Sequence, residues 1–186
     1  PRLHVARRRV AVGGSSIAGM PGRIRKAVPG VTLRTTCLVG HPGETPERFM
    51  HLRRFVERAE FDHLGVFVYS PEEGTASFDM RGGVPKREAV ARRRELMLVQ
   101  QKIVTSKARK LLGREDTFLV EEPATRTKAA VRKGRSMRDA PGIDGEVLIG
   151  GVPASVRAAS FVSARYVGMK GYDMSALYCG CEKPAG

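Results

Sequence analysis

Two clusters of polar residues in this 186-residue chain each follow an apolar, β-branched run. The run at 33–39 ends at Gly40-His41-Pro42-Gly43-Glu44, and the run at 66–68 ends at Tyr69-Ser70-Pro71. The two glycines let the backbone either turn tightly or approach a ligand closely, and both interpretations stay open. The glutamate is suited to accept hydrogen bonds from amides of the loop or of a following helix. These groups suit the binding of a polar ligand at the ends of two strands.

The segment between the two clusters has the pattern of a helix. Thr45-Pro46-Glu47 is a typical helix start, because Thr caps free amides, Pro suits the first turn and Glu favours the positive end of the dipole. Apolar residues then recur at helical spacing from Phe49 to Ala59. The order of strand, helix and strand predicts two parallel strands joined by a right-handed crossover. Because ligands bind at the carboxyl ends of parallel strands, both polar clusters are expected on one rim.

The other reactive side chains form no catalytic or metal-binding pattern. The four histidines share no metal-ligand spacing, and no Ser/His/Asp or Cys/His nucleophile arrangement can be supported. Cys37 alternates with Thr35 and Val39 on one strand face, which predicts a small buried thiol. Cys179 and Cys181 could chelate a soft metal, but two thiolates do not complete a site. We therefore predict no catalytic residue and no metal ligand in this chain.

Three segments carry a resemblance to a known family. They are the runs from Leu33 to Thr45 and from Val66 to Thr75, and Gly134-Arg135-Ser136-Met137-Arg138-Asp139-Ala140-Pro141-Gly142-Ile143-Asp144-Gly145. With them, the chain resembles the RimO-type methylthiotransferases from about Ile24 to Tyr172. The first turn and Tyr69-Ser70-Pro71 are shared with sister enzymes that act on transfer RNA. The Glu72-Glu73-Gly74-Thr75 continuation and the third segment favour the ribosomal branch.

The resemblance implies a radical S-adenosylmethionine enzyme that adds a methylthio group to an aspartyl residue of a small-subunit ribosomal protein. Its cofactors would be S-adenosylmethionine and two 4Fe-4S clusters, which carry the difficult radical step. The resemblance also implies cofactor contacts for Arg34, Gly40, Tyr69, Ser70 and Pro71. An unpaired cation in an apolar strand is costly, so Arg34 should reach a carboxylate. The carboxylate of the cofactor and a structural ion pair are both open alternatives for it.

The cysteines depart from the family pattern. Each cluster is expected on three cysteines, one set spaced Cys-x-x-x-Cys-x-x-Cys, whereas this chain has three cysteines in all and no such spacing. The chain also begins with Pro rather than Met. We interpret it as the C-terminal part of a longer protein whose cluster ligands lie upstream. We expect it to bind no cluster and to be inactive by itself.

The pattern of elements predicts an α/β part followed by an all-β part. Residues 1–84 would form the C-terminal part of a radical S-adenosylmethionine (β/α) barrel, and 85–112 a long linking helix with apolar residues every seven positions. A small β-barrel is expected over 113–178, where the family has an OB-like TRAM domain, and 179–186 would be a tail. Its strands are predicted at 117–121, 128–133, 146–149, 155–162 and 166–169.

Composition limits the partners and the compartment. The net charge of +14 suits a phosphate-rich partner such as ribosomal RNA, although the dominance of Arg over Lys can also reflect codon bias. A hydrophobic fraction of 41% is enough for a folded core, and no run reaches the ~18 apolar residues of a membrane helix. Three cysteines do not suggest a disulfide framework, which fits a reducing cytoplasm.

Three functions stay open from the sequence. The first is a segment of a methylthiotransferase that acts on a ribosomal protein, with the transfer-RNA enzymes as a variant. The second is a non-catalytic, basic module that binds RNA or the ribosome through the β-barrel and the long helix. The third is a non-functional remnant. Docking onto a ribosomal protein fits the predicted barrel at least as well as RNA binding, because its few aromatic residues support base stacking poorly.

Overall fold

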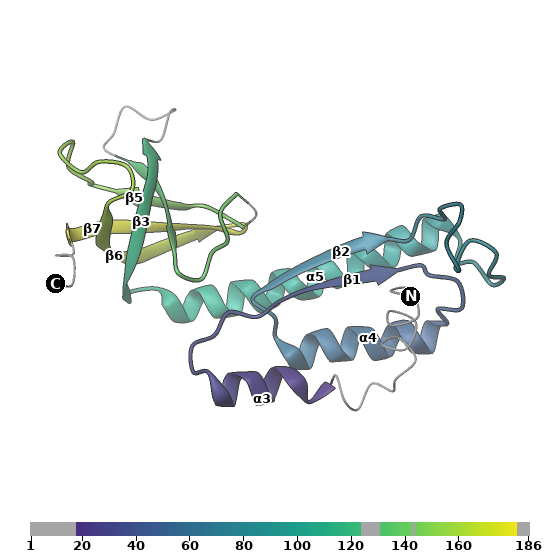
Figure 1. Ribbon diagram of the computed structural model, residues 1–186. Helices are drawn as coiled ribbons and strands as arrows, with labels where there is room; N and C mark the ends of the chain where they lie inside the picture. Colours follow the sequence, from purple (N-terminus) through teal and green to yellow (C-terminus); the bar gives the residue numbers. More distant parts are fainter. Residues whose placement is uncertain (1–17, 124–130, 143, 182–186) are drawn as a thin grey trace. The chain divides into compact units, whose positions relative to one another are not determined.

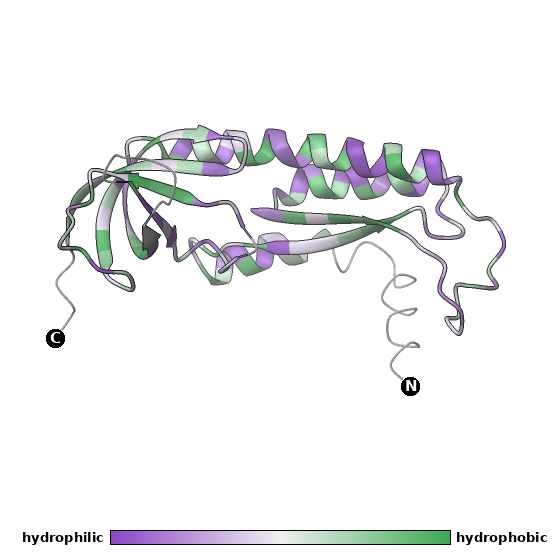
Figure 2. Ribbon diagram, turned by 90° about the horizontal axis from the view of Figure 1, so that it is seen from above, coloured by the Kyte–Doolittle hydropathy of each residue, from purple (hydrophilic) through white to green (hydrophobic). Residues whose placement is uncertain are grey.

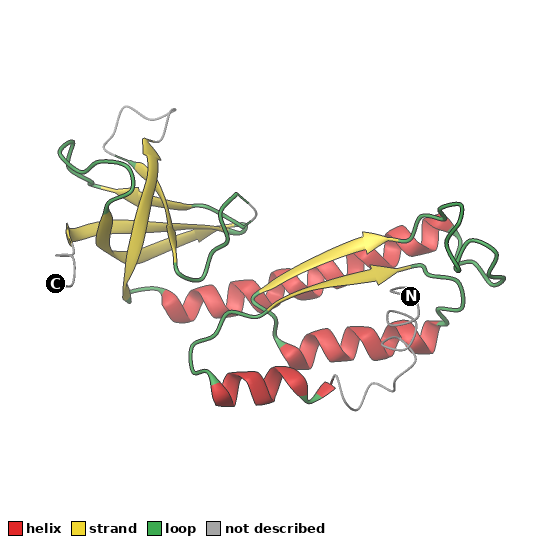
Figure 3. Cartoon of the chain, viewed as in Figure 1, coloured by secondary structure: helices red, strands yellow, loops and turns green. Residues whose placement is uncertain are grey.

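The computed structural model describes residues 18–123, 131–142 and 144–181 (Figure 1). These residues form two compact units that divide between Ile103 and Val104, inside a long helix. Figure 3 shows helices beside two strands in the first unit and a set of strands in the second. The predicted combination of an α/β part and an all-β part is confirmed.

Two parallel strands form the sheet of the first unit. The elements of this unit are α3 (Met20–Ala27), β1 (Arg34–Val39), α4 (Pro46–Ala59), β2 (His63–Val68) and the first part of α5 (Lys86–Leu111). In the register of the sheet, Arg34 lies opposite His63 and Val39 opposite Val68. Both strands therefore point the same way, and their carboxyl ends share one edge, as the sequence predicts.

Helix α4 begins and ends at specific caps. The Thr45 hydroxyl accepts a hydrogen bond from the Arg48 amide at 3.3 Å, and Pro46 occupies the first helical position. At the other end, Glu60 has a left-handed conformation with φ of 45°, and its amide donates to the Val56 carbonyl. These caps fix the crossover between β1 and β2.

Helices cover one face of the two-stranded sheet. The core on this face contains buried side chains from β1, β2, α4 and α5, namely Cys37, Val39, Phe49, Val56, Leu64, Val66 and Leu96. Side chains alternate between the two faces of a strand. On the other face, Leu38 and Phe67 lie opposite each other and are 47% and 61% exposed. Among the described residues the sheet thus has one covered face and one open, partly apolar face.

Helix α5 continues from the first unit into the second. It runs over 26 residues, close to the predicted range 85–112. In the first unit Gln100 is buried, and its amide nitrogen donates to the Phe61 carbonyl oxygen at 2.9 Å. Hydrophilic bands recur along this helix in Figure 2. None of the helices in the described ranges is long and apolar enough to cross a membrane.

The second unit contains a closed β-barrel. Its strands are β3 (Glu115–Pro123), β4 (Arg132–Ser136), β5 (Val147–Gly150), β6 (Phe161–Lys170) and β7 (Asp173–Cys181), in the order β3-β4-β5-β7-β6. Phe118 and Tyr166 fill its core with an edge-on ring contact at 5.1 Å between centroids. Burial raises the pKa of Tyr166 to about 12, against the hydrogen bond to Ser136, which lowers it. The predicted small barrel is confirmed.

Several strand predictions differ from the barrel. Strand β6 is continuous from Phe161, whereas we predicted strands at 155–162 and 166–169. Residues 153–160 form a loop with turns at 154–155 and 158–159, and Ala159 in it has φ of 63°. Strand β7 was not predicted, because its small residues give a weak β signal and it forms by pairing with both β5 and β6. The predicted strand at 128–133 lies partly outside the described residues.

Candidate functional site

The turn after β1, residues 40–44, will be called the rim turn. Gly40 and Gly43 both have φ of 82°, in the left-handed region that favours glycine. The Glu44 amide donates to the His41 carbonyl at 2.9 Å and closes the turn. The Gly43 amide donates to the Gly82 carbonyl at 3.0 Å, which connects the rim turn to the loop after β2. Backbone hydrogen bonds therefore define the shape of the turn.

Tyr69, directly after β2, lies beside the rim turn. Its amide donates to the Val39 carbonyl at 2.8 Å, which extends the parallel ladder past the end of β2. Its ring packs edge-on against His41, with centroids 5.1 Å apart. The Tyr69 hydroxyl oxygen is buried and has no hydrogen-bond partner in the described ranges. Because buried hydroxyls normally have a partner, this atom marks a place for a polar group of a ligand or of another polypeptide.

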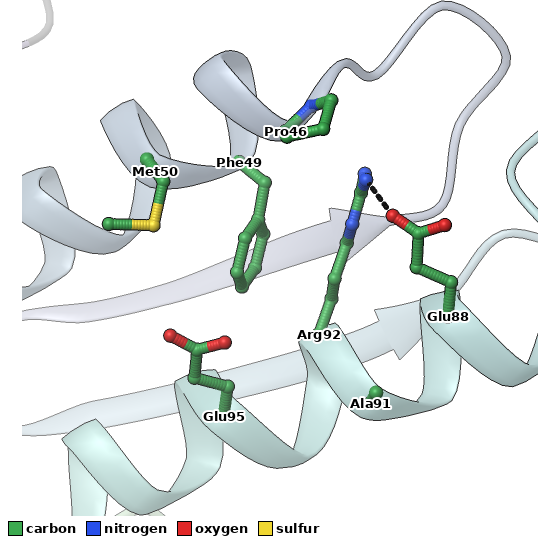
Figure 4. A pocket seen from close by; sticks show the side chains of 7 residues that line it. All are labelled: Pro46, Phe49, Met50, Glu88, Ala91, Arg92 and Glu95. Atoms are coloured by element: carbon green, nitrogen blue, oxygen red, sulfur yellow. Dashed lines mark hydrogen bonds and ion pairs between the residues drawn. The ribbon is translucent and has the colours of Figure 1, made fainter.

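Arg92 of α5 holds the rim turn against the helix. One guanidinium nitrogen donates to the Glu44 carboxylate and, at 3.0 Å, to the Glu44 carbonyl oxygen. The other nitrogen donates to Glu88 (Figure 4), and the guanidinium lies 5.4 Å from the centroid of the Phe49 ring. Arg92 is only 6% exposed, so two carboxylates compensate a buried cation. In the sequence Arg92 begins a run of three arginines, which is typical of a solvated helix face, and the burial of Arg92 departs from that pattern.

The Glu44 carboxylate joins Arg92 to the start of the rim turn. It also accepts a hydrogen bond from the Gly40 amide at 3.2 Å. Burial lowers the pKa of Arg92, but the hydrogen bonds and charges of Glu44 and Glu88 outweigh it, so the pKa rises and the side chain stays charged. A Cβ added to Gly40 would lie 2.5 Å from the Ala89 Cβ. The spacing of Ala89 and Arg92 on one helix face was the sequence signal that could have revealed this contact.

A pocket of about 270 Å³ lies between α4 and α5 (Figure 4). It is lined by Pro46, Phe49, Met50, Glu88, Ala91, Arg92 and Glu95. Glu95 at its edge pairs with Arg53 at 3.2 Å. None of the five predicted cofactor contacts lines this pocket, which shares Arg92 and its contacts Glu88 and Phe49 with the network around the rim turn. It is a groove between two helices, separate from the strand ends, and we assign no ligand to it.

The structure places four of the five predicted contact residues at the shared edge. Gly40 follows β1, and Tyr69, Ser70 and Pro71 follow β2, with Ser70 and Pro71 exposed. Arg34 is instead the first residue of β1, so roughly 17 Å of strand separates its Cα from the end of that strand. It is exposed on the open face of the sheet. The cost of burying an unpaired cation, which motivated the expectation of a carboxylate partner for Arg34, therefore does not apply.

Comparisons with known proteins agree with this architecture. Residues 112–178 match the TRAM domain family, a range that covers most of the β-barrel. A protein of Crocosphaera subtropica is 46% identical over 129 residues, which are 69% of this chain and 29% of the relative. A protein of Microcystis aeruginosa is 42% identical over 156 residues, 84% of this chain and 35% of the relative. Both are named ribosomal protein uS12 methylthiotransferase RimO.

Over the stretch that it spans, this chain belongs to the RimO family. A third RimO protein, from Gloeobacter violaceus, is 44% identical over 145 residues, 74% of this chain and 33% of the relative. The chain spans about a third of the length of the curated relatives that it matches. The resemblance stated from its three segments is confirmed.

In this member of the RimO family, the third resemblance segment, which runs from Gly134 to Gly145, contributes to a loop of the barrel. The Asp139 carboxylate accepts hydrogen bonds from the Ser136 amide at 3.0 Å and from the Ser136 hydroxyl at 2.8 Å. A Cβ added to Gly145 would lie 2.3 Å from the Tyr172 carbonyl oxygen. These residue types are therefore explained by the geometry of the loop after β4.

The described cysteines do not fit an iron–sulfur cluster. Burial raises the pKa of Cys37 from 9.0 to about 11, which favours the neutral thiol over the thiolate that a cluster needs. Cys179 is exposed and belongs to the other unit. Across 18–123, 131–142 and 144–181, no group of three or more His, Cys, Asp or Glu residues could hold a metal ion.

Proposed function

We propose that this chain is part of a cytoplasmic radical S-adenosylmethionine methylthiotransferase that modifies an aspartyl residue of a small-subunit ribosomal protein. One observation carries the proposal: proteins named ribosomal protein uS12 methylthiotransferase are 40–46% identical to this chain over 68–87% of its length. That identity extends over both units, since matches that cover 84% and 87% of the chain cannot lie within either unit alone.

The rim turn and Tyr69 would form part of the S-adenosylmethionine site. S-adenosylmethionine, when bound, would supply the methyl group and the radical chemistry. The Gly40 backbone, kept in place by Glu44 and Arg92, would form one wall, and Ser70 and Pro71 the other. The buried Tyr69 hydroxyl, which has no hydrogen-bond partner among the described residues, supports this assignment, because a polar group of the cofactor would satisfy it. Arg34, further along the open face, would meet the opposite end of the ligand or a structural partner.

The open face of the sheet supports the view that further polypeptide completes the site. Parallel sheets are normally covered on both faces. Here Leu38 and Phe67 are about half exposed, on the face that the helices of the first unit leave open. Two iron–sulfur clusters would be held by the part of the enzyme that covers this face. By itself, the chain is expected to lack methylthiotransferase activity.

The barrel would dock the ribosomal protein. Its exposed apolar side chains include Met137, Phe161 and Leu177, which are 93%, 56% and 53% exposed. Several of its basic side chains pair with carboxylates on or next to neighbouring strands, namely Lys133 with Glu146, Arg135 with Glu121 and Arg165 with Glu115. Locally balanced charge beside apolar side chains suits a protein partner better than a phosphate backbone.

A chimera tests this function. The matching residues of the Crocosphaera subtropica relative are replaced by those of this chain, and the chimera is expressed in a bacterial strain that lacks its own enzyme. We expect mass spectrometry of ribosomal protein uS12 to show the mass of one added methylthio group. The chain expressed without the rest of the enzyme should give unmodified uS12. A chimera that folds and incorporates iron but leaves uS12 unmodified would argue against the proposal.

A second measurement tests the cofactor site. In the same chimera, Tyr69→Phe removes the buried hydroxyl and should weaken S-adenosylmethionine binding in equilibrium dialysis by about tenfold, the effect of one buried hydrogen bond. Tyr172→Phe, at an exposed tyrosine of the barrel, is the matched control and should bind like the parent. Equal affinity of Tyr69→Phe and the control would remove Tyr69 from the cofactor site while leaving the overall function standing.

A further inference from the structure

The positive charge of the described residues is concentrated on helix α5. This helix carries nine basic and two acidic residues, a net charge of +7. All described residues together carry 26 basic and 18 acidic residues, a net charge of +8. Almost the whole excess of positive charge in the described parts of the chain therefore lies on one helix.

The two acidic residues of α5 do not neutralise its outer side. Glu88 pairs with the buried Arg92, and Glu95 pairs with Arg53 of α4. The side chains of Arg87, Arg94 and Lys102 are exposed, and they form no ion pair with a carboxylate anywhere in the described ranges. These three cations will be called the outer row.

The outer row lies on one side of the helix. Its members are seven and eight residues apart, so at 3.6 residues per turn they fall within an arc of about 80° around the helix axis. They therefore follow one another along one side of α5, about 11 Å apart along the axis. The buried Leu96 lies on the opposite side of the helix. Evenly spaced cations of this kind match a polymer that carries evenly spaced negative charges.

We propose that the outer row binds the phosphodiester backbone of RNA. Guanidinium groups bind phosphate oxygens in pairs, and two of the three members are arginines. A helix that binds a membrane surface needs a continuous apolar face, whereas the large exposed apolar side chains of α5 are Val90 and Leu98, which are separated along the helix by charged residues. Contact with the backbone gives affinity without sequence preference.

RNA binding by the outer row would add a second contact with the ribosomal partner of the proposed function. It rests on that function only for the source of the RNA, because a ribosomal protein is presented within a particle made largely of RNA. The barrel and α5 would then divide the contacts: apolar and balanced surfaces for the protein, the outer row for the nucleic acid. RNA binding by the chain itself does not depend on methylthio transfer.

Two matched triple variants of the 186-residue chain test the proposal. The first is Arg87→Gln, Arg94→Gln and Lys102→Gln. The second, on the exposed surface of the other unit, is Arg114→Gln, Arg157→Gln and Lys170→Gln. Both remove two arginines and one lysine, and both retain every basic residue of 1–17. Gln is a good helix former, and circular dichroism checks that each variant is folded.

The measurement is the dissociation constant for a fluorescent RNA duplex of arbitrary sequence, between about 50 and 200 mM salt. We expect the first variant to lower the slope of log affinity against log salt by about two to three, and the second by less than one. Equal losses in the two variants, or no RNA binding by the parent chain, would overturn the proposal. So would a parent chain that binds anionic vesicles or polyglutamate as tightly as RNA. If the triple variant fails to fold, Arg94→Gln alone should lower the slope by about one.

Discussion

At the scale of single residues, a buried arginine determines the shape of the candidate site. Arg92 reaches Glu44 across 48 positions of sequence, and Glu44 in turn accepts from the Gly40 amide. A buried charge is tolerated only where its partners are complete. Arg92 and Glu44 must therefore be considered as one unit, in which the loss of either leaves the other charge buried without compensation.

Replacing Arg92 should destabilise the first unit. Arg92→Met keeps the apolar stem but leaves the Glu44 carboxylate, 12% exposed, without its cation. We expect the free energy of unfolding to fall by about 3–5 kcal/mol. Arg53→Met, which breaks partly exposed ion pairs with Glu57 and Glu95, is the control and should cost less than about 1 kcal/mol. Urea unfolding followed by helical circular dichroism measures both, and similar losses would contradict the role of Arg92.

The buried thiol of Cys37 should make stability depend on pH. Burial raises its pKa from 9.0 to about 11, so the native state holds the proton more tightly than the unfolded state. The contribution of the protonated Cys37 thiol to the free energy of unfolding is fully present below pH 9 and is lost as the pH rises through 11. Between pH 8 and pH 11 the parent should lose about 2 kcal/mol more than Cys37→Ala in urea unfolding under reducing conditions. Equal losses in both proteins would show that Cys37 does not titrate in this way.

At the scale of elements, the rim turn packs closely against α5 where Gly40 faces Ala89. Gly40 has a positive φ, and the space for its Cβ is already taken by the Ala89 Cβ. The turn can therefore lie against the helix only because both residues are small. This contact, together with Arg92, positions the carboxyl end of β1 relative to the helix that covers the sheet.

Gly40→Ala separates the two requirements on this glycine. Strain from the positive φ should cost about 1–2 kcal/mol, and the clash with Ala89 a further 1–3 kcal/mol or so. Gly74→Ala is the matched control, because Gly74 has φ of 77° and nothing within 4 Å of the added Cβ. In thermal unfolding, Gly74→Ala should show only the loss of stability that comes from backbone strain. Adding Ala89→Gly to Gly40→Ala should cost less than the sum of the two single changes; additive losses would exclude the clash.

At the scale of the whole molecule, each unit has its own hydrophobic core. The barrel core contains Phe118, Ile149 and Val162, and the core of the first unit contains Val39, Val56 and Leu96. Because each set is buried within one unit, the units should lose structure separately. The long helix α5 contributes to both, with its first part in one unit and its last residues in the other.

Core truncations should therefore act on one unit at a time. Ile149→Ala should lower the stability of the barrel by about 2–5 kcal/mol and speed amide hydrogen exchange in β3–β7, with β1 and β2 unchanged. Leu96→Ala should lower the stability of the first unit by a similar free energy. It should speed amide hydrogen exchange in β1, β2 and α4 and leave exchange in the barrel unchanged. Hydrogen exchange read by mass spectrometry measures both variants. A loss of protection in both units from either change would show that they unfold together.

Local patterns in the sequence determined the elements of the first unit. The apolar, β-branched runs before Gly40 and Tyr69, and the cap at Thr45, predicted two strands, a helix and the shared edge, because such signals act over a few residues. The family resemblance came from the same short segments. The long helix was predicted to within a residue at each end, because seven-residue periodicity is also local.

Contacts between distant segments decided the rest. Arg92 is buried because the covered face of α5 meets the rim turn. Helical spacing can place Arg92 on the same face as Ala89, but its partner Glu44 lies 48 positions away and is brought to it only by the fold. Arg34 begins β1 rather than lying inside it, since pairing starts only where His63 of β2 is available. Strand β7 exists because β5 and β6 provide hydrogen bonds on both sides. Residue types over a few positions thus determined elements, whereas burial and strand pairing depend on partners that only the folded chain brings together.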